Sequence, residues 1–168
     1  NMNIGWFEPS VHELAHSWFA DMITCETWHH GWLNEGFATY ANGLWVEHKN
    51  GLQAYNNFMQ SMSYYGSGTI YLQNIDNPFG IFIPIIYNKG AWVLHMLRGI
   101  MGDEVFFDVL YTYSTSQQFQ YQNATTEQFQ AICENVSGLD LDYFFSEWIY
   151  EEFYPNIGII IISTRVMQ

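Results

Sequence analysis

The sequence predicts a mainly α-helical fold. Apolar residues recur at helical spacing along much of the chain, as they do between Ala91 and Met101. Helix start and stop signals separate these stretches, for example Pro9 before the first and Gly51 after the second. Residues 157–163 are the one run with the apolar, isoleucine-rich character of a strand. We therefore expect helices around a common core, with a short strand near the C-terminus.

The expected helices follow from these signals in chain order. The first begins at Ser10, after a proline that favours a first turn, and runs to about Met22. Gly51 ends the second, and Gly102 with the acidic residues after it begins the fifth. Further helices are expected at 33–48, 52–62, 88–101, 104–113, 125–135 and 140–151. Loops are expected at 24–31, 64–84 and 114–124; the middle one is rich in Gly and Pro.

The strand expected at 157–163 has no partner within the chain. A single strand cannot satisfy its own backbone groups, so residues 154–168 are interpreted as the start of a following β domain. Residues 1–153 then form one domain, a size that suits a single core.

Composition excludes several function classes. Four Lys and Arg residues against 17 Asp and Glu give a net charge of −13. Because phosphates are bound by Lys and Arg, no nucleic-acid partner is expected. No apolar run of about 18 residues is present, so no membrane span is expected either. Cys25 and Cys133 are interpreted as two buried thiols. The start of the chain shows no signal peptide; secretion or a periplasmic location is favoured over the cytoplasm.

The most informative motif is His12-Glu13-Leu14-Ala15-His16, followed by Glu35. Histidines at positions i and i+4 lie on one face of a helix and can share a metal ion. A second helix, reached through a loop, can return the Glu35 carboxylate as third ligand. Glu13 is then free to take a proton from a water molecule that the metal activates. The alternative is a surface helix with two unrelated histidines, which leaves their joint occurrence in an apolar helix unexplained.

Other candidate side chains have weaker signals. His29 and His30 are expected to be a solvated loop pair, and His95 a core histidine. Asp21 either orients a ligand imidazole or is simply solvated. Tyr87 is a candidate oxyanion donor, because a tyrosine at the mouth of a metal site can hydrogen-bond a developing negative charge.

Four segments resemble the M1 family of metallo-aminopeptidases, the gluzincins. HELAHSWFADMIT (12–24) resembles the zinc-site helix, and WLNEGFATY (32–40) is similar to the segment with the glutamate ligand. YNKGAWVLHMLR (87–98) looks like the tyrosine segment of the family. GLDLDYFFSEW (138–148) resembles a later helix.

The resemblance implies a thermolysin-like helical catalytic subdomain over 1–153 that removes N-terminal residues from peptides. It implies one Zn²⁺ per chain with ligands His12, His16 and Glu35, Glu13 as general base, and Tyr87 on the oxyanion. The family's amine-binding Gly-x-Met-Glu-Asn-like strand has no match in residues 1–8. The chain is therefore expected to contact N- and C-terminal domains of a larger enzyme. Whether the chain is active without those domains is left open. Two alternatives stay open: a non-catalytic zinc-binding scaffold and a thermolysin-like endopeptidase.

Overall fold

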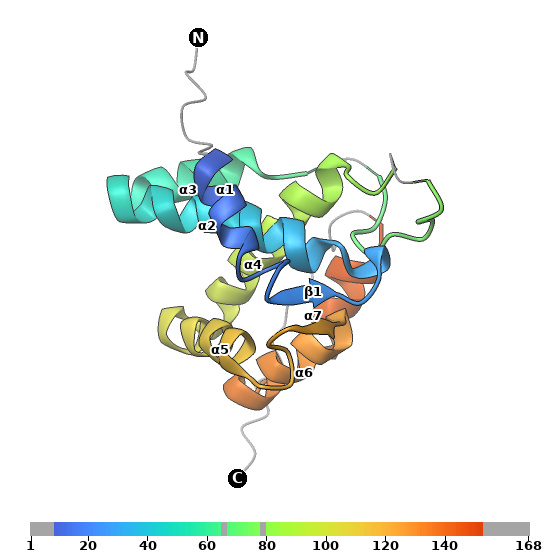
Figure 1. The fold of residues 1–168 in the computed structure, drawn as a ribbon. Helices are drawn as coiled ribbons and strands as arrows, with labels where there is room; N and C mark the ends of the chain where they lie inside the picture. Colours follow the sequence, from blue (N-terminus) through green and yellow to red (C-terminus); the bar gives the residue numbers. More distant parts are fainter. Residues whose placement is uncertain (1–8, 65–66, 78–79, 153–168) are drawn as a thin grey trace.

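The computed structural model describes residues 9–64, 67–77 and 80–152, and these form a mainly helical domain (Figure 1). The long central helices are α2 (Trp32–Asn50) and α4 (Pro84–Met101), which pack against each other. The other elements, in chain order, are α1 (Pro9–His16), β1 (Ile23–Cys25), η1 (Trp28–His30), α3 (Leu52–Ser61), α5 (Asp103–Thr115), β2 (Gln122–Ala124), α6 (Thr126–Ser137), α7 (Asp142–Phe145) and η3 (Ser146–Tyr150). The predicted fold class is confirmed. None of the described helices is long and apolar enough to span a membrane.

The core lies around α2 and α4, and aromatic rings extend it toward α5 and α6. Phe37, Tyr113 and Phe129 contact one another with ring centroids 5.1 to 5.7 Å apart. Such ring pairs add to the stabilisation that burial alone provides. The buried Lys89 donates from Nζ to the carbonyl of Glu151 at 3.1 Å, which joins α4 to the end of η3. Cys25 and Cys133 are free and buried, as predicted.

Two predicted loops contain a short parallel β pair. The register is Ile23↔Gln122, Thr24↔Asn123 and Cys25↔Ala124. The expectation of loops throughout 24–31 and 114–124 was therefore wrong at β1 and β2. Three-residue strands are too short to show a period, and their pairing depends on segments almost 100 positions apart. The pair lies between the α1–α4 part of the molecule and the α5–α6 part in Figure 1.

The first helix is shorter than predicted. It ends at His16 rather than Met22, and from Asp21 onward the backbone bonds span five residues instead of the helical four. Asp21 N–H donates to the carbonyl of His16, and Ile23 N–H donates to that of Trp18, both five residues back. This wide turn brings the chain directly into β1. The structure thus connects the histidine helix and β1 by only a few residues.

The last predicted helix, 140–151, is divided in the structure. α7 covers only Asp142–Phe145, and the chain then widens into a π-helical turn, η3. The strand expected at 157–163 lies outside the described residues, as does segment 154–168, so the predicted domain division stays a prediction.

Candidate metal centre

Helix α1 places His12 and His16 on the same side, four residues apart. Their ring centroids are 4.8 Å apart and the rings are nearly perpendicular, at 89°. His12 is buried, with 5% of its surface exposed, and His16 is half-buried. Pro9 opens the helix, where its missing N–H costs no hydrogen bond. The i, i+4 spacing predicted from the sequence therefore brings both imidazoles to one point.

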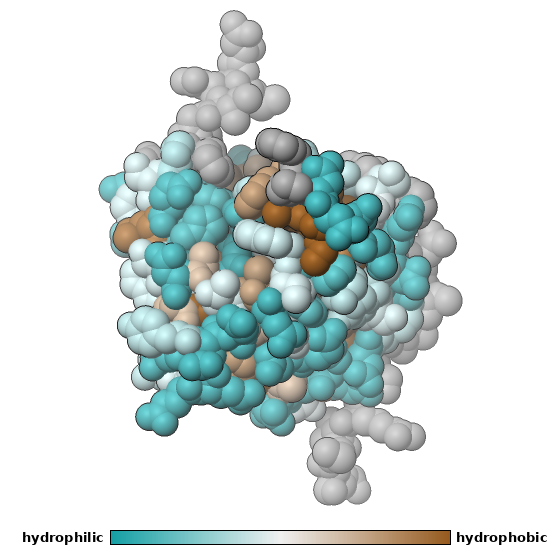
Figure 2. Space-filling view, turned by 45° about the vertical axis from the view of Figure 1, so that its right-hand side comes forward, coloured by the Kyte–Doolittle hydropathy of each residue, from teal (hydrophilic) through white to brown (hydrophobic). Residues whose placement is uncertain are grey.

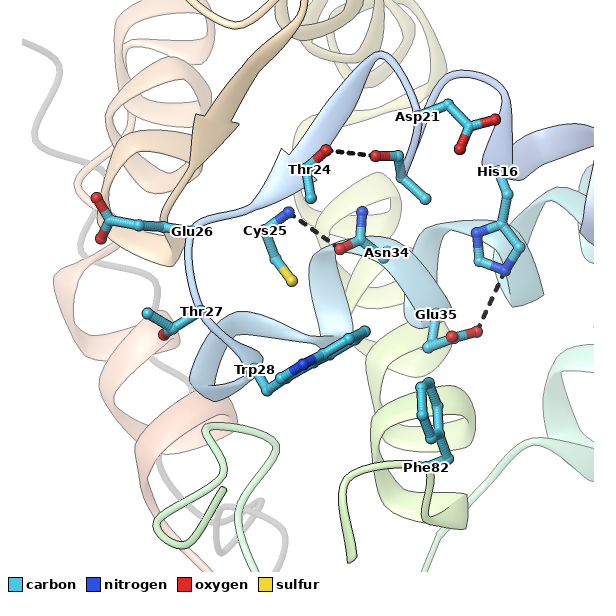
Figure 3. Close-up of a pocket in the computed structure, with 11 residues that line it drawn as sticks. His16, Asp21, Thr24, Cys25, Glu26, Thr27, Trp28, Asn34, Glu35 and Phe82 are labelled. Carbon is cyan, nitrogen blue, oxygen red and sulfur yellow. Dashed lines mark hydrogen bonds and ion pairs between the residues drawn. The ribbon is translucent and has the colours of Figure 1, made fainter. Parts of the chain in front are cut away.

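Glu35 reaches the same point from the first turn of α2. Its Oε2 lies 3.2 Å from His12 Nε2 and 3.4 Å from His16 Nε2. The ligand atoms of the three residues all lie within 4.8 Å of one another. Glu35 is only 8% exposed, so its carboxylate lies in the interface between α1 and α2. Figure 3 shows the His16 ring and this carboxylate pointing toward each other.

The geometry of these three groups fits a zinc ion. Two atoms about 2.0–2.1 Å from a common tetrahedral zinc are roughly 3.3 Å apart. The distances of 3.2 and 3.4 Å match that separation. Two imidazoles and one carboxylate are also a donor set that catalytic zinc sites use, with a fourth position left for water or substrate.

A backbone carbonyl orients the His16 ring. His16 Nδ1 lies 3.3 Å from the carbonyl oxygen of Phe19. A ring nitrogen can meet a carbonyl only as a donor, so Nδ1 carries the proton and the lone pair of Nε2 faces Glu35. Asp21, which sequence reasoning considered for this task, is exposed beside His16 (Figure 3). The orienting hydrogen bond thus comes from the main chain.

Tyr87 and Glu13 lie next to the three metal-ligand candidates. The Tyr87 ring, in the first turn of α4, stacks on His12 with centroids 6.0 Å apart and planes at 23°. Burial, together with the negative charges of Glu35 and Glu13, raises the pKa of Tyr87 to about 12. The phenol therefore stays protonated near neutral pH and can donate a hydrogen bond. Glu13 itself is exposed, so water can reach its carboxylate.

A cavity of about 560 Å³ opens beside His16 and Glu35. Trp28 and Phe82 form part of its wall, with ring centroids 5.2 Å apart, and both are considerably exposed. Figure 2 shows that hydrophobic residues gather in the upper half of one face, among mostly hydrophilic ones. The cavity also borders Cys25 and Asn34, two residues that the sequence did not connect with the site.

His29, His30 and His95 have structural contacts outside the metal centre. The prediction of a solvated pair was wrong for His30, which is buried: its Nδ1 accepts from Thr126 N–H at 3.1 Å. Burial lowers the pKa of His30. His29 Nδ1 donates to the carbonyl of Leu72. His95 is half-buried and, as predicted, has a partner within the protein: its Nδ1 is hydrogen-bonded to the Tyr55 hydroxyl at 2.8 Å.

Among the described residues, a second cluster of potential metal ligands consists of three carboxylates, and hydrogen bonds within the protein explain their proximity. Glu134, Asp140 and Asp142 bring carboxylate oxygens within 4.8 Å of one another. Glu134 accepts from Leu141 N–H at 3.0 Å, and Gln130 donates to both Glu134 and Asp142. These bonds join the end of α6 to the start of α7, where the first backbone N–H groups of a helix need hydrogen-bond acceptors.

Comparisons with known proteins agree with this geometry. A family model described as the peptidase family M1 domain matches residues 8–148. Aminopeptidase M1-D of Oryza sativa subsp. japonica is 34% identical over an alignment of 161 residues that covers 89% of this chain and 18% of that protein. Aminopeptidase M1 of Arabidopsis thaliana is 36% identical over 161 residues, 88% of this chain and 18% of the relative. The chain thus spans about a fifth of the length of these curated relatives.

Solved structures give the same result. The crystal structure of an M1 zinc metallopeptidase from Deinococcus radiodurans superposes with a TM-score of 0.70 and 31% identity, covering 82% of this chain and 31% of that one. Aminopeptidase A of Legionella pneumophila, in complex with aspartic acid, reaches a TM-score of 0.75 over 84% of this chain and 16% of that one. At 22% identity, the second likeness shows the fold alone.

Proposed function

The chain belongs to peptidase family M1, and from this premise we propose that it provides the catalytic centre of a zinc-dependent aminopeptidase. The observation that carries the proposal is the convergence of His12, His16 and Glu35 at separations that suit one tetrahedral ion. These three residues would hold one zinc ion per chain. The relatives named aminopeptidase, and the neighbour named zinc metallopeptidase, support this assignment.

The metal would supply Lewis acidity: bound zinc polarises a carbonyl group and lowers the pKa of a water molecule. The chain's own residues provide the remaining chemistry. Glu13 lies one position after His12, is exposed to water, and as a carboxylate can accept a proton and return it to the leaving amine. Glu35 is less suited to this task, because its carboxylate is buried and in contact with both histidines and so cannot exchange protons freely with water.

Tyr87 is the proposed oxyanion donor. Its ring is stacked on His12, and its phenol is protonated because burial raises its pKa to about 12. It can therefore donate to the substrate oxygen that gains negative charge during attack on the peptide bond. A donor positioned for that oxygen stabilises the transition state more than the ground state.

The test of this function is hydrolysis of aminoacyl-anilides and short peptides with free and with blocked N-termini. We expect cleavage only of substrates with a free amine, loss of cleavage with a chelator, and recovery when zinc is added back. Cleavage of blocked peptides would instead indicate an endopeptidase. Silence on every peptide, unchanged by chelator or zinc, would favour the non-catalytic scaffold.

A further inference from the structure

Asn34 has an unusual position: it directly precedes Glu35 in α2, but its side chain is bonded to β1. Its Oδ1 accepts from Cys25 N–H at 3.0 Å, and its Nδ2 donates to the carbonyl of Ile23 at 3.1 Å. The residue is 4% exposed. Figure 3 shows the carboxamide directed toward the main chain of Cys25.

These two bonds imitate a neighbouring β-strand. In a parallel ladder, one residue donates N–H to a carbonyl on the adjacent strand and accepts from the N–H two residues further along. The Asn34 carboxamide makes this pair of bonds with Ile23 and Cys25. The opposite edge of β1 is occupied by β2, since Glu26 N–H donates to the carbonyl of Ala124 at 2.9 Å. Asn34 thus satisfies the edge of β1 that β2 leaves open.

The bonds of Asn34 also connect the two halves of the metal centre. The histidine helix α1 leads through residues 17–22 into β1, and Asn34 joins β1 to the first turn of α2, next to Glu35. The first turn of α2 also has its own backbone bonds, such as Glu35 N–H to the carbonyl of Gly31, but these do not link it to β1. The side-chain bonds of Asn34 therefore restrict how far Glu35 can move from His16.

We propose that Asn34 is a positioning residue for the metal centre, holding Glu35 in its ligand position through the two hydrogen bonds to β1. The inference rests on the proposed function, because it assumes that His12, His16 and Glu35 bind zinc. Residues that hold ligands in place typically change metal affinity about 10–100-fold when they are replaced. The quantity to measure is thus the zinc dissociation constant, not activity.

The experiment compares zinc affinity of the 168-residue chain and its variants by competition with a chelating dye. We expect Asn34→Leu, of similar volume but without polar atoms, to weaken zinc binding about tenfold or more. Asn34→Asp keeps the acceptor for Cys25 N–H and loses the donor for Ile23. Its added negative charge would by itself favour a cation, so weaker binding by this variant must come from the lost bond.

Thr126→Val is the matched control. The Thr126 hydroxyl accepts from Trp32 Nε1–H at 3.0 Å and lies 3.0 Å from His30 Nδ1, so it also anchors the start of α2, but not to β1. We expect this variant to melt at a lower temperature and to bind zinc within twofold of the parent. Parent-like affinity in both Asn34 variants would overturn the inference; if Asn34→Leu does not fold, Asn34→Asp decides. A parent chain that binds no zinc would overturn the proposed function instead.

Discussion

Glu13 and Glu35 are carboxylates close to the same two histidines, but their surroundings differ. Glu35 is buried, and its Oε2 contacts both Nε2 atoms. Glu13 projects from α1 into solvent. Two carboxylates in one site commonly divide their tasks according to environment. The buried one suits a fixed ligand, and the exposed one suits proton transfer.

This division predicts the effect of Glu13→Gln. The substitution keeps size and polarity but removes the ability to accept a proton, so zinc content should be unchanged. Turnover of an aminoacyl-anilide should fall about 10²–10⁴-fold, the usual contribution of a general base. Elemental analysis and steady-state rates measure the two quantities. Turnover equal to that of the parent would show that another group takes the proton.

The matched variant is Glu35→Gln, which places the same chemical change at the ligand position. It should lose zinc as well as activity, since a neutral amide is a poorer zinc ligand than a carboxylate. Equal loss of zinc in both variants would contradict the assignment of separate roles.

Individual site residues could be predicted from the sequence where the spacing between two residues fixes their relative positions on a helix. Positions 12 and 16 share a helical face whatever surrounds them, so the histidine pair was predictable. Asn34 was not, because an asparagine near a helix start has many uses and its partners lie on β1. His30 was misinterpreted for the same reason: its burial depends on Thr126, which is 96 residues away.

Helices α2 and α4 approach each other closely at two glycines adjacent to the site. A Cβ atom on Gly36 would lie 2.9 Å from Gly90 Cα, and one on Gly90 would lie 2.9 Å from Gly36 Cα. Gly36 follows Glu35 directly, and Gly90 lies one turn after Tyr87. The distance between the two helix axes therefore also sets how the ligand and the proposed oxyanion donor face each other.

Gly90→Ala should consequently be destabilising. The added methyl group has no room against the backbone of α2, and overpacking of this kind costs about 1–3 kcal/mol. Denaturant unfolding measures the free energy of unfolding. Gly99→Ala in the same helix is the control: no atom lies within 4 Å of its Cβ position. Replacing that helical glycine should stabilise the chain by about 0.5–1 kcal/mol. Equal effects from both substitutions would refute a tight contact at Gly90.

Element boundaries were predicted best where a local signal ends the helix. Gly51 and Gly102 adopt positive φ angles of 84° and 79°, which glycine accepts readily, and both mark observed ends. The end of α1 had no such signal. Residues 17–22 remain compatible with a helix, and the chain turns because Ile23 and its neighbours pair with β2, where Tyr121 N–H donates to the carbonyl of Met22.

Across the whole molecule, two histidines that are shielded from solvent, the buried His30 and the half-buried His95, connect stability to pH. Burial lowers the pKa of His30 despite the nearby Glu127 and Glu26 carboxylates, and burial together with Arg98 lowers that of His95. In the unfolded chain both would titrate near 6.5. Below that pH the unfolded state binds more protons than the folded state, so the free energy of unfolding decreases as pH falls. Above about pH 7.5 both states are neutral at these residues and the effect disappears.

Urea unfolding in the presence of a chelator, between pH 7.5 and 5.5, tests this dependence. We expect stability to decrease by at most about 1.4 kcal/mol per pH unit for each of the two histidines. His95→Gln removes one titrating group and should reduce the slope. A free energy of unfolding that stays constant over this range, or rises as pH falls, would exclude His30 and His95 as the cause.

Long-range organisation was the least predictable level. The resemblance to a known family indicated a helical catalytic subdomain, which the structure confirms. The arrangement of α5 and α6 below the β pair depends on contacts such as Phe37 with Tyr113 and Phe129, which no local pattern shows. Local rules thus predicted most of the helices, and only the three-dimensional structure showed the β pair and how the elements are arranged.

The most direct test of the central claim is the zinc content of the chain after exposure to zinc and extensive dialysis. Elemental analysis should find one zinc per chain in the parent and in Thr126→Val. It should find almost none in Glu35→Ala and in His12→Ala, because each lacks one of the three ligands. A zinc-free parent, or zinc retained in full by both ligand variants, would contradict the account.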